Sequence, residues 1–174
     1  MSVSPAWIVN ASPFIGLAKI GRLNLLTRSA PSASDRAVFL PDAVAREIAA
    51  GTAEDAAVRA LSNLGDQGIT VLPPVTPDPR LAAFTLDAGE TAVLTEALAR
   101  PGCVAVIDDG PGRAAAQVLG VSLVGSVGVL ILARRQGGLT ALAPEIRALQ
   151  SVGLFLPREG VLRALLAEIG ETWP

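Results

Sequence analysis

The sequence predicts an α/β domain in which helices cover both faces of a parallel sheet. Of its 174 residues 51% are hydrophobic and only 3% aromatic, and short apolar runs alternate with helical segments. Small and branched aliphatic residues suit helices packed on a sheet, and the alternation implies right-handed crossovers between parallel strands. The length suits one well-buried core, so we expect a single domain over residues 1–174.

Short apolar runs between turn residues predict the strands of this sheet. The clearest is the run over residues 103–107, five consecutive apolar residues as in the centre of a parallel sheet. The other predicted strands cover residues 6–9, 38–40, 69–72, 121–124 and, as a short edge strand, 154–156.

Helices are predicted between these runs. The first follows Asn10, with Ser12 suited to cap it and Pro13 suited to its first turn, and it ends near Gly21. The other predicted helices cover residues 23–26, 43–50, 54–67, 81–86, 91–100, 113–119, 126–137, 143–152 and 160–169. Residues 31–36 are predicted to form a loop. Four prolines within residues 73–79 require an extended connector.

One stretch has the length of a membrane span. Residues 114–133 carry no charge over 20 residues. Gly120, Gly125 and Gly128 interrupt this run, which predicts a helix, a short buried strand and a second helix instead. The first ten residues lack the basic start and long apolar run of a signal peptide, so we expect a cytoplasmic protein without a membrane segment.

The absence of histidine and of a second cysteine limits the catalytic and metal-binding chemistry open to this chain. The chain has no His, which excludes a Ser-His-Asp triad, a His general base and His-containing metal sites. Its single cysteine, Cys103, excludes disulfide frameworks and thiolate zinc sites. The remaining oxygen ligands favour Mg²⁺ or Mn²⁺. Because the net charge is -2, a nucleic acid would need a local basic patch or a bridging cation.

Polar side chains follow two predicted strands, where a parallel sheet gathers its ligands. Asn10 follows the first strand, and Asp108 and Asp109 follow the strand over residues 103–107. Glu90 opens one predicted helix and Glu47 lies inside another. Each has an ordinary alternative: a turn residue for Asn10, helix caps for the two aspartates, a first-turn carboxylate for Glu90 and a solvated side chain for Glu47.

The order of four short segments adds to these signals. They read IVNASPFI at residues 8–15, LPDAVAREI at 40–48, DAGETAVL at 87–94 and VIDD at 106–109. Together they resemble PIN-domain proteins, most closely a prokaryotic subgroup with Asn instead of Asp at the first acidic position. The resemblance covers residue 7 to about residue 157. It implies a three-layer α/β/α sandwich with a central parallel sheet of about five strands.

The resemblance also implies Mg²⁺- or Mn²⁺-dependent cleavage of RNA. Many members are toxins of toxin–antitoxin pairs, which adds an antitoxin protein to the expected partners. Carried over by position, the catalytic and metal-binding places fall on Asn10, Glu47, Glu90 and Asp109. Asp108 adjoins the last of these and could substitute for it as a metal ligand.

Further residues are candidates for contact with the substrate. By the same resemblance, Ser12 matches a small hydroxyl residue that steadies the first metal position. Arg113, Arg134 and Arg135 are candidate phosphate contacts near the same edge of the sheet, with a solvated helix surface as the alternative.

The neutral Asn10 leaves a second function open. It removes one negative charge from the pocket, so we expect weaker metal binding and activity that is weak, requires Mn²⁺ or is absent. The alternative is therefore a PIN-like module that binds nucleic acid or protein without cutting. A phospho-acceptor receiver domain is rejected, because it needs acidic residues after an early strand and a lysine after a late one, whereas the only lysine is Lys19. The aliphatic helices leave apolar surface for a homodimer.

Overall fold

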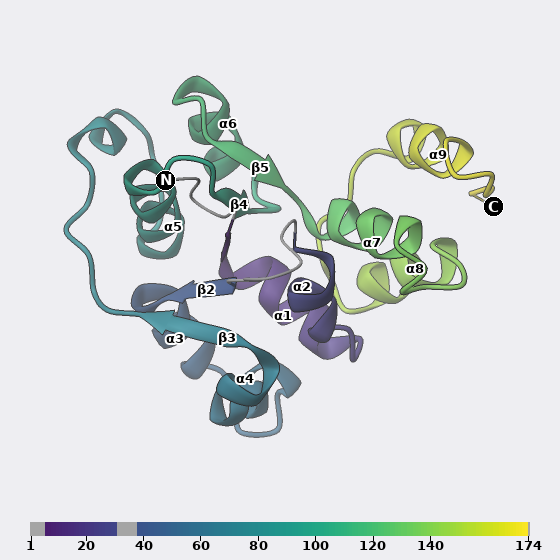
Figure 1. Ribbon diagram of the computed structural model, residues 1–174, viewed down its shortest axis with the longest axis horizontal. Helices are drawn as coiled ribbons and strands as arrows, with labels where there is room; N and C mark the ends of the chain where they lie inside the picture. The colour runs from purple at the N-terminus through teal and green to yellow at the C-terminus, as the bar shows by residue number, and fades with distance from the viewer. Residues whose placement is uncertain (1–5, 31–37, 174) are drawn as a thin grey trace.

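The structure is a computed structural model that describes residues 6–30 and 38–173. These residues form one five-stranded sheet in the order β3-β2-β1-β4-β5, and every pair of neighbouring strands is parallel. The strands are β1 (Trp7–Val9), β2 (Val38–Pro41), β3 (Ile69–Leu72), β4 (Val104–Val106) and β5 (Ser122–Val124). The predicted parallel sheet is confirmed (Figure 1).

Helices and 3-10 turns connect these strands. The helices are α1 (Ala11–Lys19), α2 (Asn24–Ser29), α3 (Asp42–Ala49), α4 (Ala56–Ala60), α5 (Ala88–Ala99), α6 (Gly110–Val118), α7 (Ser126–Arg135), α8 (Ala143–Ser151) and α9 (Glu159–Ala167). The 3-10 turns are η1 (Leu61–Asn63), η2 (Gly65–Gln67) and η3 (Pro79–Ala83).

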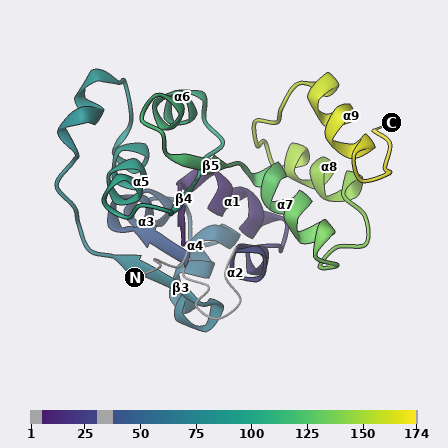
Figure 2. The ribbon, with the colours of Figure 1, turned by 45° about the horizontal axis from the view of Figure 1, so that its top comes forward.

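The helices form two layers around the sheet. Helix α1 contacts α3, α4 and α7, whereas α5 contacts α6 together with β1, β2 and β4, and α3 also contacts α5. This division follows from right-handed crossovers, which place helices on opposite faces when the chain moves in opposite directions across the sheet. Strand β1 lies between the layers, so Trp7, Ile8 and Val9 are all buried. The fold is an α/β/α sandwich, and Figures 1 and 2 show α7, α8 and α9 gathered at one end of it.

The stretch over residues 114–133 forms part of α6, then β5, then most of α7, as predicted. Among the helices of residues 6–30 and 38–173, none combines the length and the apolar character that a membrane crossing requires.

The predicted edge strand over residues 154–156 is wrong. This segment follows α8 and lies against the helical layer, where both terminal methyl groups of Leu154 lie 3.2 Å from the position that a β-carbon on Gly16 would take. Leu154 therefore packs on α1, Phe155 is 84% exposed, and the segment does not pair with a strand. The predicted loop over residues 31–36 lies outside the described residues.

Three helix predictions also need correction. The helix predicted over residues 54–67 is only α4, because Asp55 caps it by accepting a hydrogen bond from Ala57 N and 3-10 turns follow up to Gly68, whose φ is 71°. The helix predicted over residues 81–86 is the 3-10 turn η3, which begins earlier, at Pro79. Ser12 lies inside α1 and does not cap it, because the helix begins at Ala11.

The strand order places a switch point at the middle of the sheet. From β1 the chain moves to β2 and β3 on one side and later to β4 and β5 on the other. Val9 is in register with Val106, so β1 and β4 end together. In open parallel sheets the ligand crevice lies where the direction reverses, at the carboxyl ends of the strands. The residues after Val9 and Val106 therefore face the expected site.

Candidate functional site

Asn10 stands at the carboxyl end of β1 and is 3% exposed. Its backbone N–H donates to Val106 O at 3.0 Å, which fixes its place beside β4. It occupies the N-cap position of α1, yet its side chain makes no cap hydrogen bond. Within the described part of the chain, Asn10 Oδ1 is a buried oxygen without any hydrogen-bond partner. An oxygen left in this state is costly unless something else binds it.

Gly89 marks the point toward which three side-chain oxygens converge. A β-carbon at this glycine would stand 2.8 Å from Glu47 Oε2, 3.0 Å from Asn10 Oδ1 and 3.3 Å from Asp87 Oδ1. These oxygens come from α3, the end of β1 and the start of α5. Only a residue without a side chain leaves room for all three oxygens, so their positions account for a glycine at residue 89.

Asp87 and Glu90 form a capping box at the start of α5. Glu90 N donates to Asp87 Oδ1 at 2.7 Å, and Asp87 N donates to Glu90 Oε2 at 3.2 Å. Glu90 is 4% exposed, and its Oε1 accepts a hydrogen bond from Gly112 N at 2.8 Å. Glu90 therefore joins α5 to α6 and has a structural role whatever else it does.

Asp109 stands at the N-cap position of α6, directly after β4. Its side chain makes no cap hydrogen bond but accepts one from Ser12 Oγ at 2.9 Å. Ser12 thus links the first turn of α1 to the end of β4. The hydroxyl steadies Asp109, whereas the resemblance implied that it steadies Asn10.

The carboxylates of this edge act on one another electrostatically. Burial raises the pKa of the Glu47 carboxyl above its ordinary value, and three nearby carboxylates raise it further. They belong to Asp87, Asp109 and Glu90. Glu47 is an exposed residue, so its carboxylate lies at the edge of the cluster, in contact with water and close to the other carboxylates. Burial also raises the pKa of Glu90, and the charge of Asp87 adds to this. Carboxylates held this close together repel one another, and a bound cation would relieve that repulsion.

Asp108 faces away from this cluster. Its Oδ1 accepts a hydrogen bond from Ser126 N at 2.7 Å and its Oδ2 one from Ser126 Oγ at 2.6 Å. Burial raises the pKa of Asp108, and the hydrogen bonds from Ser126 oppose that effect. Both oxygens therefore anchor the start of α7, which makes Asp108 a poor substitute for Asp109.

The arginines lie differently from the prediction. Arg113 remains at this edge, in the first turn of α6, where one guanidinium N–H donates to Ile107 O at 2.9 Å. Arg134 is not brought to the site: it lies in the last turn of α7, at the far end from the sheet edge, and pairs with Glu171 at 3.0 Å. Arg135 pairs with Glu168 in the same region. The structure therefore does not bring Arg134 and Arg135 to this edge of the sheet, and a phosphate contact by either of them stays a prediction.

Sequence reasoning missed two residues of the site. Asp87 was not proposed, although an acid three residues before Glu90 at the start of an apolar run is the spacing of a capping box. Arg46 is not among the predicted site residues, but it lines one cavity of about 480 Å³ together with Glu47. Nothing in the local sequence signals this placement of Arg46, because it depends on how α3 packs against α5.

The donors at this edge fit a divalent cation in their chemistry. Asn10 Oδ1 has no partner in the described ranges, and the carboxylates of Glu47, Asp87 and Asp109 retain free lone pairs for a hard cation. Among residues 6–30 and 38–173, however, no three acidic side chains are already arranged to hold a metal. Side chains at the rim, Glu47 above all, would have to turn inward when a cation binds.

In a comparison with known protein families, a family model described as a PIN domain matches residues 6–171. The match includes every element from β1 to α9. No curated protein matches the chain.

Proposed function

Because the chain belongs to the PIN-domain family, whose members are typically nucleases, we propose that it is a metal-dependent ribonuclease of PIN type. One observation supports this above the others: Asn10 Oδ1 is buried, has no hydrogen-bond partner among the described residues, and lies beside the Glu47 and Asp87 carboxylates at Gly89. The site stands at the carboxyl edge of the sheet, beside the strand switch point.

PIN domains generally use divalent metal ions, and Asn10, Glu47, Asp87 and Asp109 are the residues that would hold one here. When bound, Mg²⁺ or Mn²⁺ supplies positive charge that polarises a scissile phosphate and lowers the pKa of an attacking water.

The chain's own contacts support this role by holding the donors in place. Ser12 fixes Asp109 through its hydroxyl. Glu90 ties α5 to α6 through Gly112 N, which keeps Asp87 and Asp109 at a constant separation. In the same cavity as Glu47, Arg46 offers a cation for the phosphate backbone of the RNA.

Cleavage of RNA by the purified protein tests the proposal. We expect cleavage with Mn²⁺, loss of cleavage in EDTA, and loss in both Asp109→Asn and Glu47→Gln. The matched control is Asp66→Asn, the same chemical change at an exposed residue of η2. Cleavage that persists in Asp109→Asn and Glu47→Gln would reject this site.

A second candidate function is a PIN-like module that binds nucleic acid or protein with little or no cutting. The neutral Asn10 at the first acidic position supports this function. So does the finding that, in the described part of the chain, no three acidic side chains are already positioned to bind a metal ion. Metal-dependent RNA binding without cleavage, at any Mn²⁺ concentration, would favour this function over the first.

The toxin role is a finer part of the proposal and rests on the family alone. Expression in a bacterial host should slow growth, and Asp109→Asn should relieve that effect at equal protein level. An antitoxin partner would appear as a small protein, encoded beside this gene, that restores growth and co-purifies. Equal growth with both forms would remove the toxin role but leave the nuclease activity to be judged by the cleavage assay.

A further inference from the structure

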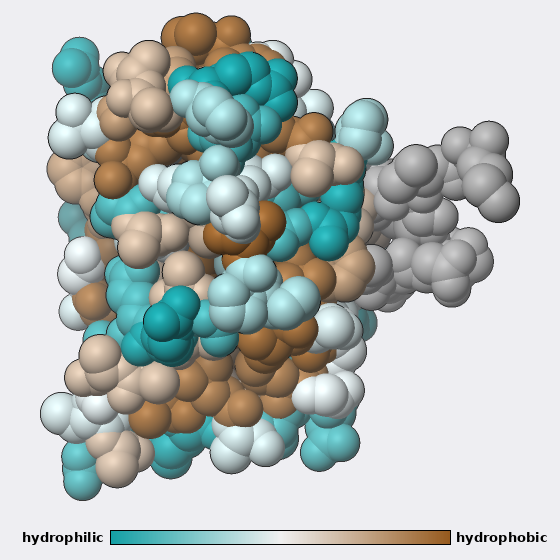
Figure 3. Space-filling view, turned by 90° about the vertical axis from the view of Figure 1, so that its left-hand side faces the viewer, coloured by the Kyte–Doolittle hydropathy of each residue, from teal (hydrophilic) through white to brown (hydrophobic). Residues whose placement is uncertain are grey.

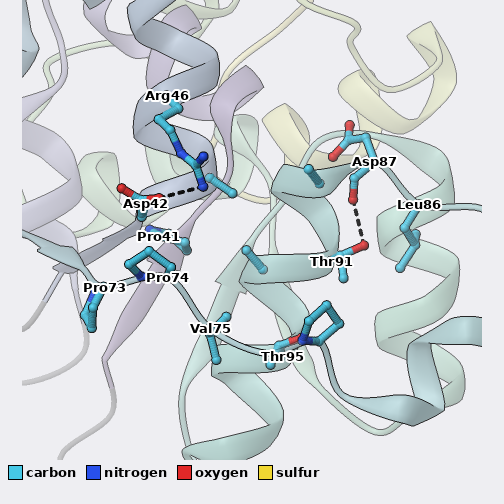
Figure 4. Close-up of a pocket in the computed structure, with 14 residues that line it drawn as sticks. Pro41, Asp42, Arg46, Pro73, Pro74, Val75, Leu86, Asp87, Thr91 and Thr95 are labelled. Atoms are coloured by element: carbon cyan, nitrogen blue, oxygen red, sulfur yellow. Dashed lines mark hydrogen bonds and ion pairs between the residues drawn. The ribbon is translucent and has the colours of Figure 1, made fainter.

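A second cavity adjoins the acidic one. It has a volume of about 290 Å³ and lies between α3, α5 and the proline-rich connector that follows β3 (Figure 4). Four residues line both cavities, namely Ala43, Arg46, Asp87 and Ala88. The two cavities are therefore continuous, and a chain lying across the carboxylates can reach into the second one. Figure 3 shows this side of the molecule, where apolar and polar residues alternate in small patches.

The walls of the second cavity are mainly apolar. They comprise Pro41, Pro73, Pro74, Val75, Pro77 and Leu86. Two threonines of α5, Thr91 and Thr95, add hydroxyl groups on the opposite side. Apolar walls with a few polar groups are typical of pockets for small, flat ligands, and a base that leaves its stack is held between such side chains.

The connector forms a wall that is held in shape before any ligand binds. Its proline rings restrict the backbone. At its end, Asp78 N donates to Thr95 Oγ1 at 3.1 Å, and Asp78 Oδ1 accepts a hydrogen bond from Arg80 N at 2.9 Å. A wall that already has its shape lowers the cost of binding a ligand.

Arg46 stands where the two cavities meet. Its Nη2 lies 2.7 Å from Asp42 Oδ2, and its side chain is 71% exposed (Figure 4). Exposed pairs of this kind contribute little, so the guanidinium can leave Asp42 for a phosphate. A cation at this point offsets the repulsion between a nucleotide and the acidic cluster, and so suits the phosphate that connects the two cavities.

We propose that this second cavity, which we call the base pocket, receives one unpaired nucleobase of the RNA strand whose phosphate lies at the acidic cavity. The inference rests on the proposed ribonuclease function and adds a base-binding subsite to it. A volume of about 290 Å³ suits a single nucleoside. A base paired within a duplex is unable to enter, so this pocket takes a base of a single strand or a base extruded from a loop.

Two neighbouring residues of the connector give a matched pair of variants. Val75 lines the base pocket, whereas Thr76 is exposed and does not line it. Val75→Glu and Thr76→Glu add the same charge to the same segment, but only the first places it in the pocket. The probe is a fluorescein-labelled single-stranded heptanucleotide of RNA with Ca²⁺, followed by anisotropy and checked for intactness. We expect Val75→Glu to weaken binding about tenfold and Thr76→Glu to change it less than twofold.

Removal of single bases provides an independent measurement. In a series of heptanucleotides, each position in turn is made abasic. With the wild-type protein, one position should lose about tenfold in affinity when its base is removed, and Val75→Glu should add no further loss at that position. Equal affinity across the whole series, or equal behaviour of the Val75→Glu and Thr76→Glu variants, would overturn the base pocket.

Cleavage of the same strands with Mn²⁺ separates this inference from the proposed function. Base-dependent binding without carboxylate-dependent cleavage would support the base pocket and reject the nuclease. Carboxylate-dependent cleavage that ignores both the missing base and Val75→Glu would support the nuclease and reject the base pocket. No binding of any heptanucleotide would reject both.

Discussion

At the scale of single residues, the amide oxygen of Asn10 is the least ordinary feature of the site. A buried oxygen without a hydrogen bond costs about 1–3 kcal/mol, and Asn10 Oδ1 is in this state among the described residues. Asparagine at an N-cap position usually accepts a hydrogen bond from the first turn of its helix. Here the oxygen lies beside Glu47 and Gly89 instead, which is the placement expected of a cation ligand.

Asn10→Asp should tighten Mn²⁺ binding, because it places a full negative charge where a neutral oxygen now stands. We expect the Kd from calorimetry to fall about tenfold, equal to about 1.4 kcal/mol. The control is Asn63→Asp, the same change at an exposed residue of η1. An unchanged Kd in Asn10→Asp would mean that Asn10 does not contact the cation.

Glu47→Gln should stabilise the protein in the absence of metal. Burial and then the neighbouring carboxylates raise the pKa of Glu47 in the folded state above its ordinary value of 4.5. The folded state therefore holds its proton longer than the unfolded state does, and the free energy of unfolding falls as pH rises from about 4.5 through the raised pKa. Above this window the charged Glu47 destabilises the fold, and Gln removes that effect.

Urea unfolding in EDTA measures this effect. The wild type and Glu47→Gln should differ little below pH 4 and should separate as the pH rises toward 7, with Glu47→Gln the more stable. The exposed Glu54→Gln serves as the control. A destabilised Glu47→Gln at pH 7 would show that the Glu47 carboxylate stabilises the fold and is not held there for function.

Asn10, Glu90 and Asp109 are predictable candidates because each follows a strand or opens a helix, whereas Glu47 lies inside α3 and is a candidate only through the order of the four segments. The structure brings Glu47 close to the other carboxylates and to Asn10, and their roles stay predictions. The orientation of their side chains could not be predicted, since it depends on long-range contacts. Asp108 and Asp109 are adjacent in sequence, yet one bonds to Ser126 and the other to Ser12. The place of the Arg134 side chain could not be predicted either, because its partner Glu171 lies 37 residues away in the sequence.

At the scale of elements, three helix N-termini build the site. Asn10, Asp87 and Asp109 occupy the N-cap positions of α1, α5 and α6, and these helices start at the same edge of the sheet. The positive end of a helix dipole favours carboxylates within its first turn. The arrangement therefore tolerates the gathered negative charge before any cation is present.

Two substitutions at Asp87 separate its capping role from its charge. Asp87→Ala removes both and should destabilise the protein by about 1 kcal/mol. Asp87→Ser keeps an acceptor for Glu90 N, so its stability should stay close to that of the wild type while its affinity for Mn²⁺ falls as in Asp87→Ala. Unfolding curves and calorimetry of both variants test this. Wild-type Mn²⁺ affinity in Asp87→Ser would assign Asp87 to capping alone.

The strands were predicted more accurately than the helices. Residues 69–72 form β3 with the predicted bounds, because a mostly β-branched run between turn residues has few alternatives. The region after α4 was predicted as one long helix, and the structure divides it into 3-10 turns. Local periodicity does not reveal that difference. The edge strand predicted over residues 154–156 is wrong, because a short apolar run can pack against helices as well as pair at the edge of a sheet.

At the scale of the whole molecule, few of the described cationic side chains serve the site. Arg113 is bonded to Ile107 O, and Arg134 and Arg135 pair with acids near the C-terminus. Among the described residues, Arg46 lines both the acidic cavity and the base pocket. The net charge of -2 adds no general attraction for RNA. In the proposed complex, binding of RNA would therefore depend on the metal and on contacts with bases more than on the phosphate backbone.

This distribution of charge predicts that the affinity for RNA depends only weakly on salt concentration. With about two phosphate contacts, the slope of log K against log salt for a single strand should be about −1.4. Anisotropy titrations of a heptanucleotide between 50 and 200 mM KCl, at fixed Ca²⁺, would measure it. A slope several times steeper would indicate a basic surface elsewhere on the protein and would contradict this account of the interface.

The expected homodimer stays a prediction. The most exposed large apolar side chain among the described residues is Phe155, at 84%, and it lines a cavity formed with α7 and α9. Sedimentation of the wild type and of Phe155→Ser would show whether this side chain takes part in association.

A crystal soaked in MnCl₂ tests the central claim most directly, because anomalous scattering locates the ion without any assay of activity. The account predicts a Mn²⁺ peak bounded by Asn10 Oδ1 and the carboxylates of Glu47 and Asp109, at the carboxyl ends of β1 and β4. It predicts that the peak is lost in crystals of Asp109→Asn. A Mn²⁺ ion bound only at other carboxylates, with Asn10 Oδ1 still lacking a ligand, would contradict it.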